Sequence, residues 1–363
     1  MRQKDCSISG GPGTAARRDI RICGSVAILA LAAVAASPTP AHADEGGGSF
    51  WQPGTYDSFA AVPVEPGWSF SATYTHAAAS AGAAVAAARE IQIGRLDPNL
   101  KATLSANVSG VADTILISPS YAFKTPVLGA QAVASVSTLL GRTSTALSGT
   151  VTASLGPLTL ARSDSITDAV TGFGDLSPQL TLNWSKGLHN FMVYGTGNIP
   201  VGAYRSTRLS NLGLGRGAVD AGGGYTYLNS DAGYEFSAVA GLTYNLLNPS
   251  TNYQSGVDFH LDWGASRNLT DVLFVGPVGY FYNQIGCDSG SGDRVGCFES
   301  RVAGLGAQVG YSFPMGKYEG YLNLKSYGDF AAQNRGSGWS VWLAFTISPP
   351  EAAAAPSRPM LHK

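Results

Sequence analysis

The sequence predicts an all-β fold, a transmembrane antiparallel β-barrel of about 12 strands, or 14 if residues 143–160 hold a further strand pair. Charged residues make up only 13% of the chain, against roughly 25% in soluble domains. Segments of about ten residues alternate between apolar and polar side chains. Their polar face carries Ser, Thr, Asn, Gln and Tyr rather than the Lys and Glu that face bulk water. After residue 43 no apolar run reaches the 18 residues typical of a spanning helix.

Residues 1–43 have the pattern of a secretory signal peptide. Three arginines precede the apolar run GSVAILALAAVAA, and an A-x-A cleavage motif ends at Ala43. A retained membrane anchor is the alternative, but this run of 13 residues is shorter than the ~20 residues that a spanning helix needs. We therefore expect the mature chain to start at Asp44, in an oxidising compartment.

The remaining elements follow in chain order. Residues 44–66 are expected to form a periplasmic tail or a short plug in the lumen, residues 67–348 the barrel, and residues 349–363, rich in Pro and Ala, a disordered tail. Alternation places strands at 67–76, 111–123, 128–141, 176–185, 189–200, 217–228, 234–247, 256–266, 272–285, 299–313, 318–328 and 338–348.

The connections between these strands fall into two alternating sets. One set is short, and the other is longer and includes residues 77–110, 142–175 and 329–337. Residues 77–94 can be read as helical or as a low-complexity loop. Bacterial barrels have short periplasmic turns and long extracellular loops. The sequence therefore predicts that the long connections lie at the extracellular end.

Alternation also assigns the inward and outward faces. In VDFHLDW the three charged or imidazole side chains share one face, and the aromatic and aliphatic side chains share the other. Trp68, Trp184, Trp263 and Trp339 stand at ends of apolar faces and are expected to form interfacial girdles. The residues expected to line the lumen and the solute path are Gln179, Thr181, Asn183, Asp258, His260, Asp262, Tyr321, Asn323, Lys325, Tyr327 and Trp342.

Cys287 and Cys297 are the two cysteines that follow the signal peptide, and glycine and polar residues separate them. A zinc site would want about four ligands, and no other cysteine or histidine lies near this pair. A redox C-x-x-C pair has a different spacing. We therefore expect a structural disulfide in the extracellular loop 286–298, which would stabilise it by about 2–3 kcal/mol in the chain-entropy model.

Composition and motifs argue against other function classes. A net charge of −1 is unlike the clustered basic excess of a nucleic-acid binder. Asp258, His260 and Asp262 share one strand face, as in some catalytic or metal sites, but adjacent same-face residues lie about 7 Å apart. A polar lumen explains the same pattern. The sequence shows no nucleophile elbow or phosphate loop, and we expect no catalytic site, metal or cofactor.

Four stretches resemble the meta-pathway phenol-degradation family: GFGDLSPQLTLNW at 172–184, NIPVGAY at 198–204, TNYQSGVDFHLDW at 251–263 and GPVGYFYNQIG at 276–286. The resemblance covers most of the chain from about residue 67 to residue 348. It implies an exported outer-membrane channel encoded near aromatic catabolism. It does not specify the substrate, and it carries no catalytic residues over to this chain.

The expected function is passive uptake of small hydrophobic or aromatic compounds, such as phenols, through the bacterial outer membrane. A lumen that combines aromatic stacking surfaces with hydrogen-bonding groups suits such solutes, provided that binding stays weak enough for release. The alternative is a structural or adhesion barrel with a closed lumen. Expected partners are outer-membrane lipid, lipopolysaccharide and the barrel-assembly machinery, whose signal GSGWSV resembles. Lipopolysaccharide phosphates would meet the loop arginines Arg205, Arg208, Arg216 and Arg294.

Overall fold

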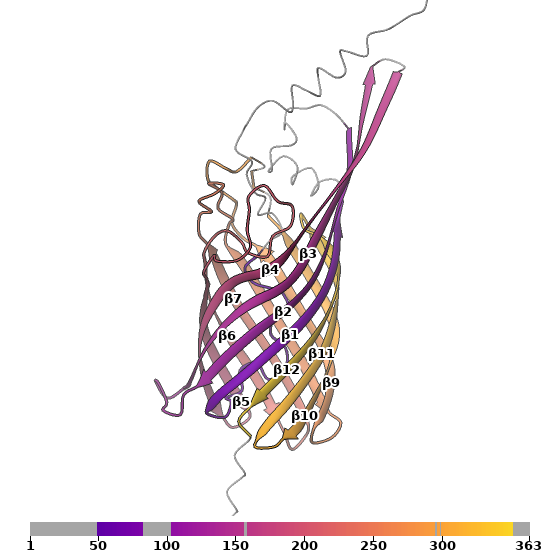
Figure 1. Ribbon diagram of the computed structural model, residues 1–363. Coiled ribbons are helices and arrows are strands. Elements are labelled where there is room, and N and C mark those ends of the chain that lie inside the picture. Colours follow the sequence, from indigo (N-terminus) through magenta and orange to yellow (C-terminus); the bar gives the residue numbers. More distant parts are fainter. Residues whose placement is uncertain (1–48, 83–102, 156–157, 295, 298, 351–363) are drawn as a thin grey trace, which may run out of the picture. The chain divides into compact units, whose positions relative to one another are not determined.

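The structure is a computed structural model that describes residues 49–82, 103–155, 158–294, 296–297 and 299–350. No helix in these residues is long and apolar enough to cross a membrane. The described residues form the strands β1 (Gly67–Ala81), β2 (Thr103–Ala122), β3 (Gln131–Leu155), β4 (Leu158–Lys186), β5 (His189–Asn198), β6 (Ala218–Asn229), β7 (Tyr234–Asn245), β8 (Asp258–Asn268), β9 (Leu273–Gln284), β10 (Arg301–Met315), β11 (Tyr318–Gln333) and β12 (Ser337–Ser348) (Figure 1).

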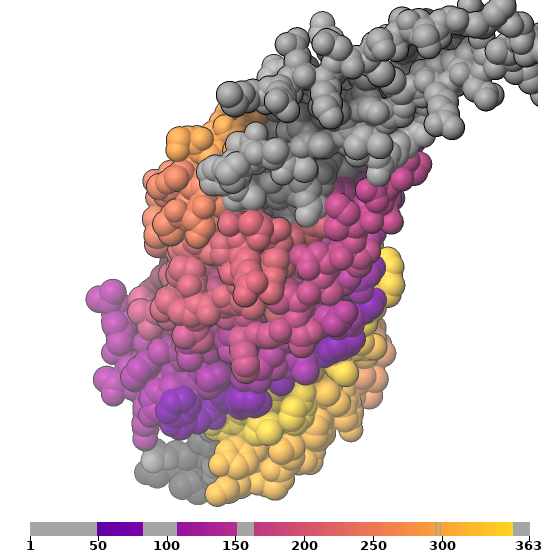
Figure 2. Space-filling view, turned by 45° about the horizontal axis from the view of Figure 1, so that its top comes forward, coloured from indigo at the N-terminus to yellow at the C-terminus, as the bar shows by residue number. Residues whose placement is uncertain are grey.

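The strands close into a single antiparallel barrel in chain order. Closure is made by β1 and β12, which pair from Phe70 with Ile347 to Ser80 with Ser337. Figure 2 shows the indigo residues of β1 beside the yellow residues of β12. A closed sheet pairs its backbone groups from strand to strand, which is what a structure surrounded by hydrocarbon requires. The predicted all-β barrel of 12 strands is confirmed.

Two predicted loops are wrong, because the neighbouring strands continue through them. β3 has 25 residues and β4 has 29, and their pairing extends to Leu155 with Leu158. The expected loop 142–175 is therefore mostly strand, and residues 143–160 lengthen a hairpin instead of adding a strand pair. This long hairpin projects past the other strands in Figure 1. Similarly, β11 continues to Gln333, which leaves only residues 334–336 before β12.

The other connections agree better with the expected pattern. Short turns join β4 to β5, β6 to β7, β8 to β9 and β10 to β11, whereas residues 199–217, 246–257 and 285–300 form longer connections at the opposite end of the barrel. The expected loop 77–110 is also wrong at both ends, because residues 77–81 belong to β1 and residues 103–110 belong to β2. Residues 83–102, which include most of the segment 77–94, lie outside the described residues. The assignment of the long connections to the extracellular side stays a prediction.

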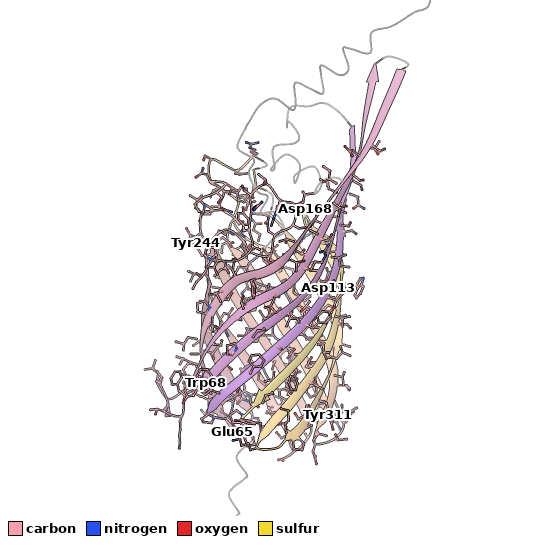
Figure 3. All side chains as sticks on the ribbon, viewed as in Figure 1. Glu65, Trp68, Asp113, Asp168, Tyr244 and Tyr311 are labelled. Atoms are coloured by element: carbon pink, nitrogen blue, oxygen red, sulfur yellow. A yellow bond between two sulfur atoms is a disulfide. The ribbon has the colours of Figure 1, made fainter. Side chains whose placement is uncertain are left out.

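The outward face of the barrel is apolar. Leu180, Leu242 and Leu343 are 51%, 50% and 43% exposed, whereas the alternate positions on their strands are mainly polar and turned inward. Aromatic side chains stand near both ends, with Trp68 and Tyr311 at the short-turn end and Tyr244 at the other (Figure 3). An apolar band between aromatic rims is the arrangement of outer-membrane barrels.

Three of the four tryptophans that were expected in an aromatic girdle lie near strand ends, and one does not. Trp68 and Trp339 are 69% and 51% exposed near strand ends, and Trp184 donates from Nε1 to the carbonyl of Leu128 in a turn, at 3.2 Å. Trp263 instead lies in the middle of β8. Its indole covers Gly279 on β9, where a Cβ would come within 2.6 Å of the ring, so close packing against glycine places this side chain.

We expect a charged side chain in the middle of the apolar band to destabilise the barrel. Leu261 lies on the outward face near the centre of β8, and we expect Leu261→Arg to lower the free energy of unfolding by about 2–4 kcal/mol. Leu269→Arg is the matched control, because this leucine is 57% exposed in the turn after β8. Its loss should be about 0–1 kcal/mol. Denaturant titration of both variants in liposomes measures the difference, and equal losses would contradict the membrane position of β8.

Candidate functional site: the barrel lumen

Residues 49–64, here called the inner segment, lie inside the barrel. Their main anchor is Asp262 of β8, whose side chain is fully buried. Its carboxylate accepts hydrogen bonds from Trp51 Nε1 at 3.2 Å, Gly54 N at 2.8 Å and Tyr56 N at 3.1 Å. Hydrogen bonds to a carboxylate are stronger than those between neutral groups. Residues 49–64 thus contact the lumen wall, whereas a role for residues 44–66 as a plug stays a prediction.

A second anchor is Lys325 of β11. Its Nζ donates to the carbonyl of Gly54 and to Asp57 Oδ2, both at 2.7 Å, and lies 5.0 Å from the Trp342 ring centroid. Gly54 has a φ of +88°, and a Cβ there would lie 2.9 Å from the Tyr327 ring. Glycine is therefore required at the point where the inner segment passes between the two anchors.

Further contacts follow the inner segment along the lumen. Phe59 N donates to Glu235 Oε1 at 3.0 Å, and Ala61 N donates to Thr226 Oγ1 at 3.0 Å. Near β1, Val64 N donates to Gln131 Oε1 at 2.8 Å, at the first residue of β3. Together with Asp262 and Lys325, these partners come from the five strands β3, β6, β7, β8 and β11. Several strands thus hold the segment through non-covalent bonds.

Trp51 covers the most buried part of the lumen. Its indole stacks on the His260 imidazole with ring centroids 3.7 Å apart. His260 Nε2 lies 3.0 Å from Asp220 Oδ2 and 3.3 Å from the Tyr194 hydroxyl. His260 and Asp220 are both buried. The imidazole is thus enclosed by barrel side chains and the inner segment, and its nearest carboxylate belongs to β6 rather than to its own strand.

The structure turns all of the expected lumen residues inward, but only some of them meet. Asp262, Lys325, Tyr327, His260 and Gln179 contact the inner segment, the last through a 2.9 Å bond from Nε2 to the Tyr56 hydroxyl. Burial raises the pKa of the Tyr56 phenol above its ordinary value, so this hydroxyl stays protonated. The others line the wall without a hydrogen bond or ring stack to the inner segment among the described contacts: Thr181, Asn183, Asp258, Asn323 and Trp342 are buried, and Tyr321 is half-buried.

Several residues of this site are missing from the expected set. Two of them are Tyr282 and Asn245, which bond the expected Asp258: the Tyr282 hydroxyl donates at 2.8 Å and Asn245 Nδ2 donates at 2.9 Å. Asp258 therefore does not pair with His260. Asp220 lies in the glycine-rich stretch VDAGGGY, where glycines hide the apolar and polar alternation. Arg216 was expected on the surface of a loop, but it is 2% exposed and its Nε donates to Asn245 Oδ1 at 3.3 Å. This arginine therefore belongs to the interior.

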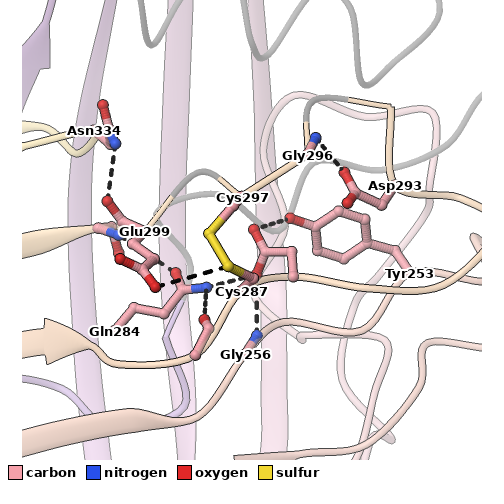
Figure 4. The surroundings of a disulfide bond; sticks show 12 residues. Tyr253, Gly256, Gln284, Cys287, Asp293, Gly296, Cys297, Glu299 and Asn334 are labelled. Carbon is pink, nitrogen blue, oxygen red and sulfur yellow. Dashed lines mark hydrogen bonds between the residues drawn. A yellow bond between two sulfur atoms is a disulfide. The ribbon is translucent and has the colours of Figure 1, made fainter.

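The connection 285–300 contains the expected disulfide between Cys287 and Cys297, with Cα atoms 4.6 Å apart (Figure 4). Beside it, Asp288 accepts from the Tyr253 hydroxyl at 2.6 Å, from Gln284 Nε2 at 2.6 Å and from Gly256 N at 3.0 Å. Glu299 lies close to both sulfur atoms, but sulfurs that are bonded to each other do not supply the thiolates of a zinc site.

We expect loss of this disulfide to loosen the loop and leave the barrel folded. The double variant Cys287→Ser and Cys297→Ser removes a crosslink that closes only ten residues of separation, whereas the strand ladder remains complete. The loop should become more sensitive to protease by about 30-fold, if the crosslink contributes about 2 kcal/mol to loop order. Limited proteolysis with peptide mapping measures this change. A barrel that no longer folds would contradict a role confined to the loop.

Comparison with known proteins gives the chain a family. Residues 94–345 match the family described as "Putative MetA-pathway of phenol degradation", whereas no curated protein matches the chain. The crystal structure of the COG4313 outer membrane channel from Pseudomonas putida F1 is similar, with a TM-score of 0.59 and 12% identity over 80% of this chain and 99% of that chain. This likeness shows a shared outer-membrane barrel fold.

Two further structures resemble the barrel more weakly. A Pseudomonas aeruginosa FadL homologue has a TM-score of 0.38 and 10% identity over 86% of this chain and 98% of that chain. The Ralstonia pickettii toluene transporter TbuX has a TM-score of 0.35 and 9% identity over 79% of this chain and 90% of that chain. Neither likeness is close enough to support an argument. The family match, which spans more than half of the 363 residues, shows that this chain belongs to the phenol-degradation family that it describes.

Proposed function

We propose that the barrel is a channel for passive uptake of small hydrophobic or aromatic compounds, such as phenols, across the outer membrane. The observation that carries this proposal is a lumen occupied only in part by a short segment held through non-covalent contacts. A cavity of about 300 Å³ remains between that segment and β2–β5. Reversible displacement of the inner segment would extend this cavity into a path, and no covalent step is needed.

The lumen chemistry supports a sparingly soluble solute. Tyr280, Tyr282, Tyr327 and Trp342 form an aromatic cluster on one side of the lumen, and hydroxyl and amide side chains line the other side. Aromatic faces attract aromatic solutes, and polar groups orient them. The family description points to phenol degradation, and the similar structure from Pseudomonas putida is described as an outer membrane channel.

A closed structural barrel is the second candidate, because one observation favours it. The inner segment contacts several strands and fills the lumen at His260, which is fully buried. If these contacts never open, the barrel transports nothing. The same burial speaks against catalysis at His260, since a substrate could not reach the imidazole without displacing Trp51.

Conductance in a planar lipid bilayer tests the proposal. The purified chain should give discrete current steps if the inner segment moves aside, and a steady zero current if the lumen stays sealed. Uptake into liposomes from a panel of phenols, alkanes and sugars then identifies the solute class. Uptake of phenols in preference to sugars is expected, whereas equal uptake of sugars would indicate a general pore.

The membrane partners form a finer part of the proposal. Outer-membrane lipid would cover the apolar outward face, and the barrel-assembly machinery would insert it. Lipopolysaccharide phosphates would meet Arg205, which is exposed in the connection 199–217, rather than the buried Arg216. Binding of lipopolysaccharide to Arg205→Ala, compared with the unchanged chain, tests this contact.

A further inference from the structure

The lumen is filled unevenly by its own side chains. β9 and β11 contribute Tyr280, Tyr282 and Tyr327 to a packed cluster. The wall formed by β2–β5 instead presents small residues to the interior, among them Ala112, Ser137 and Ser177. Small side chains leave room that large ones would occupy, so the cavity of about 300 Å³ lies against this wall.

The cavity has one apolar and aromatic boundary. Phe50 and Trp51 of the inner segment line it, together with Leu116 of β2, Leu139 of β3 and Leu212 of the connection 199–217. Its volume is at the lower end of the range for ligand pockets, about 300–1,000 Å³. A single aromatic ring, rather than a fused ring system or a fatty acid, matches this size and these surfaces.

The other boundary offers hydrogen-bond acceptors. Ser137 Oγ donates to the carbonyl of Ser177 at 3.4 Å, and Thr196 Oγ1 donates to the carbonyl of Pro178 at 2.9 Å. Since each hydroxyl proton is directed at the backbone, the oxygen lone pairs remain to accept a bond. A ligand that donates a hydroxyl proton is complementary to this boundary.

The one ionisable residue that lines this cavity is Asp175. Its carboxylate accepts bonds from Asn198 Nδ2, Gly202 N and Leu214 N, each at 2.8 Å. These donors use much of the capacity of the Asp175 carboxylate to accept hydrogen bonds, and they anchor it to the connection 199–217. The described lining thus supplies no cation for an anionic ligand, and burying an unpaired charge is costly.

We infer that this cavity binds one neutral, single-ring aromatic alcohol, with the ring against Trp51 and Phe50 and the hydroxyl donating to the threonine and serine oxygens of β3–β5. The anionic phenolate and aromatic carboxylates are excluded, since the described lining of the cavity supplies no cation to pair with a buried negative charge. The inference rests on the proposed function for the general class of solute, and it adds the site, the charge state and the direction of the hydrogen bond.

Calorimetric titration of the purified full-length barrel with 4-methylphenol tests the site. Ser137→Phe places a ring in the cavity and should weaken binding by about ten-fold or more. Val136→Phe is the matched control, because the adjacent residue points outward and is 41% exposed; its affinity should be unchanged. Benzoate should not bind the cavity. Equal affinities of the two variants for 4-methylphenol, or benzoate binding that Ser137→Phe abolishes, would overturn the inference.

A second measurement does not depend on the folding of Ser137→Phe. Ser177→Cys introduces a thiol on the cavity wall, and saturating 4-methylphenol should slow its reaction with a water-soluble maleimide several-fold, whereas benzoate should not. An unchanged rate overturns the site. If the barrel conducts but 4-methylphenol does not protect the thiol, the channel function stands and the binding site is disproved. If 4-methylphenol protects the thiol but the barrel neither conducts nor takes up phenols, the binding site stands and the channel function is disproved.

Discussion

Deletion of residues 49–64 is expected to produce a continuously open pore and to raise solute flux into liposomes by about ten-fold or more. The strand ladder closes without the inner segment, since β1 pairs with β12 and β2 along its length. Water would enter the vacated space and solvate Asp262, Lys325 and Glu235, which avoids the cost of a buried unpaired charge. Single-channel recording should show long openings in place of brief ones.

The control for this deletion removes residues 351–363, which lie beyond β12. That shorter chain should conduct like the full chain. Unchanged conductance after deletion of 49–64 would show that the inner segment is not the barrier. Heat-modifiable migration on gels reports whether each chain forms a barrel, so a loss of folding is distinguished from a loss of transport.

Most of the barrel could be predicted because lipid and lumen impose opposite demands on alternate residues. In VDFHLDW this alternation is complete, and the strand expected at 256–266 is observed at Asp258–Asn268. The extensions of β3 and β4 were missed because residues 143–169 are rich in Thr, Ser and Ala, whose small side chains give little contrast between faces. Strand length beyond the membrane depends on pairing, which the local pattern does not report.

The lumen residues could be assigned to a face, but their partners could not. Asp262 and Gly54 are 208 positions apart in the chain, and Lys325 and Asp57 are 268 apart. No periodicity connects such positions, and the inner segment has no alternation of its own. The disulfide was easier to predict, because the two cysteines that follow the predicted signal peptide offer one intramolecular pairing. Long-range contacts of an irregular segment thus require the three-dimensional structure.

Replacing Asp262 by alanine is expected to release the inner segment without deleting it. The change removes three hydrogen bonds from Trp51, Gly54 and Tyr56 to one buried carboxylate. Hydrogen bonds to charged groups contribute about 1.5–3 kcal/mol each, and partial compensation by water leaves a loss of about 3 kcal/mol. The ratio of displaced to docked segment should therefore rise by about 100-fold. Labelling of a thiol introduced as Ser58→Cys, at a side chain that is 6% exposed in the docked segment, measures this ratio.

Asp258→Ala is the matched control for Asp262→Ala, since both aspartates are buried on the inward face of β8. Asp258 bonds Tyr282 and Asn245 of the barrel wall and makes no hydrogen bond to the inner segment among the described contacts. Its loss should destabilise the barrel while leaving thiol labelling at position 58 slow. Equal labelling in the two variants would mean that general loosening of the lumen, rather than the Asp262 anchor, controls the segment. Fast labelling confined to Asp262→Ala, together with increased conductance, would identify this carboxylate as the group that holds the channel closed.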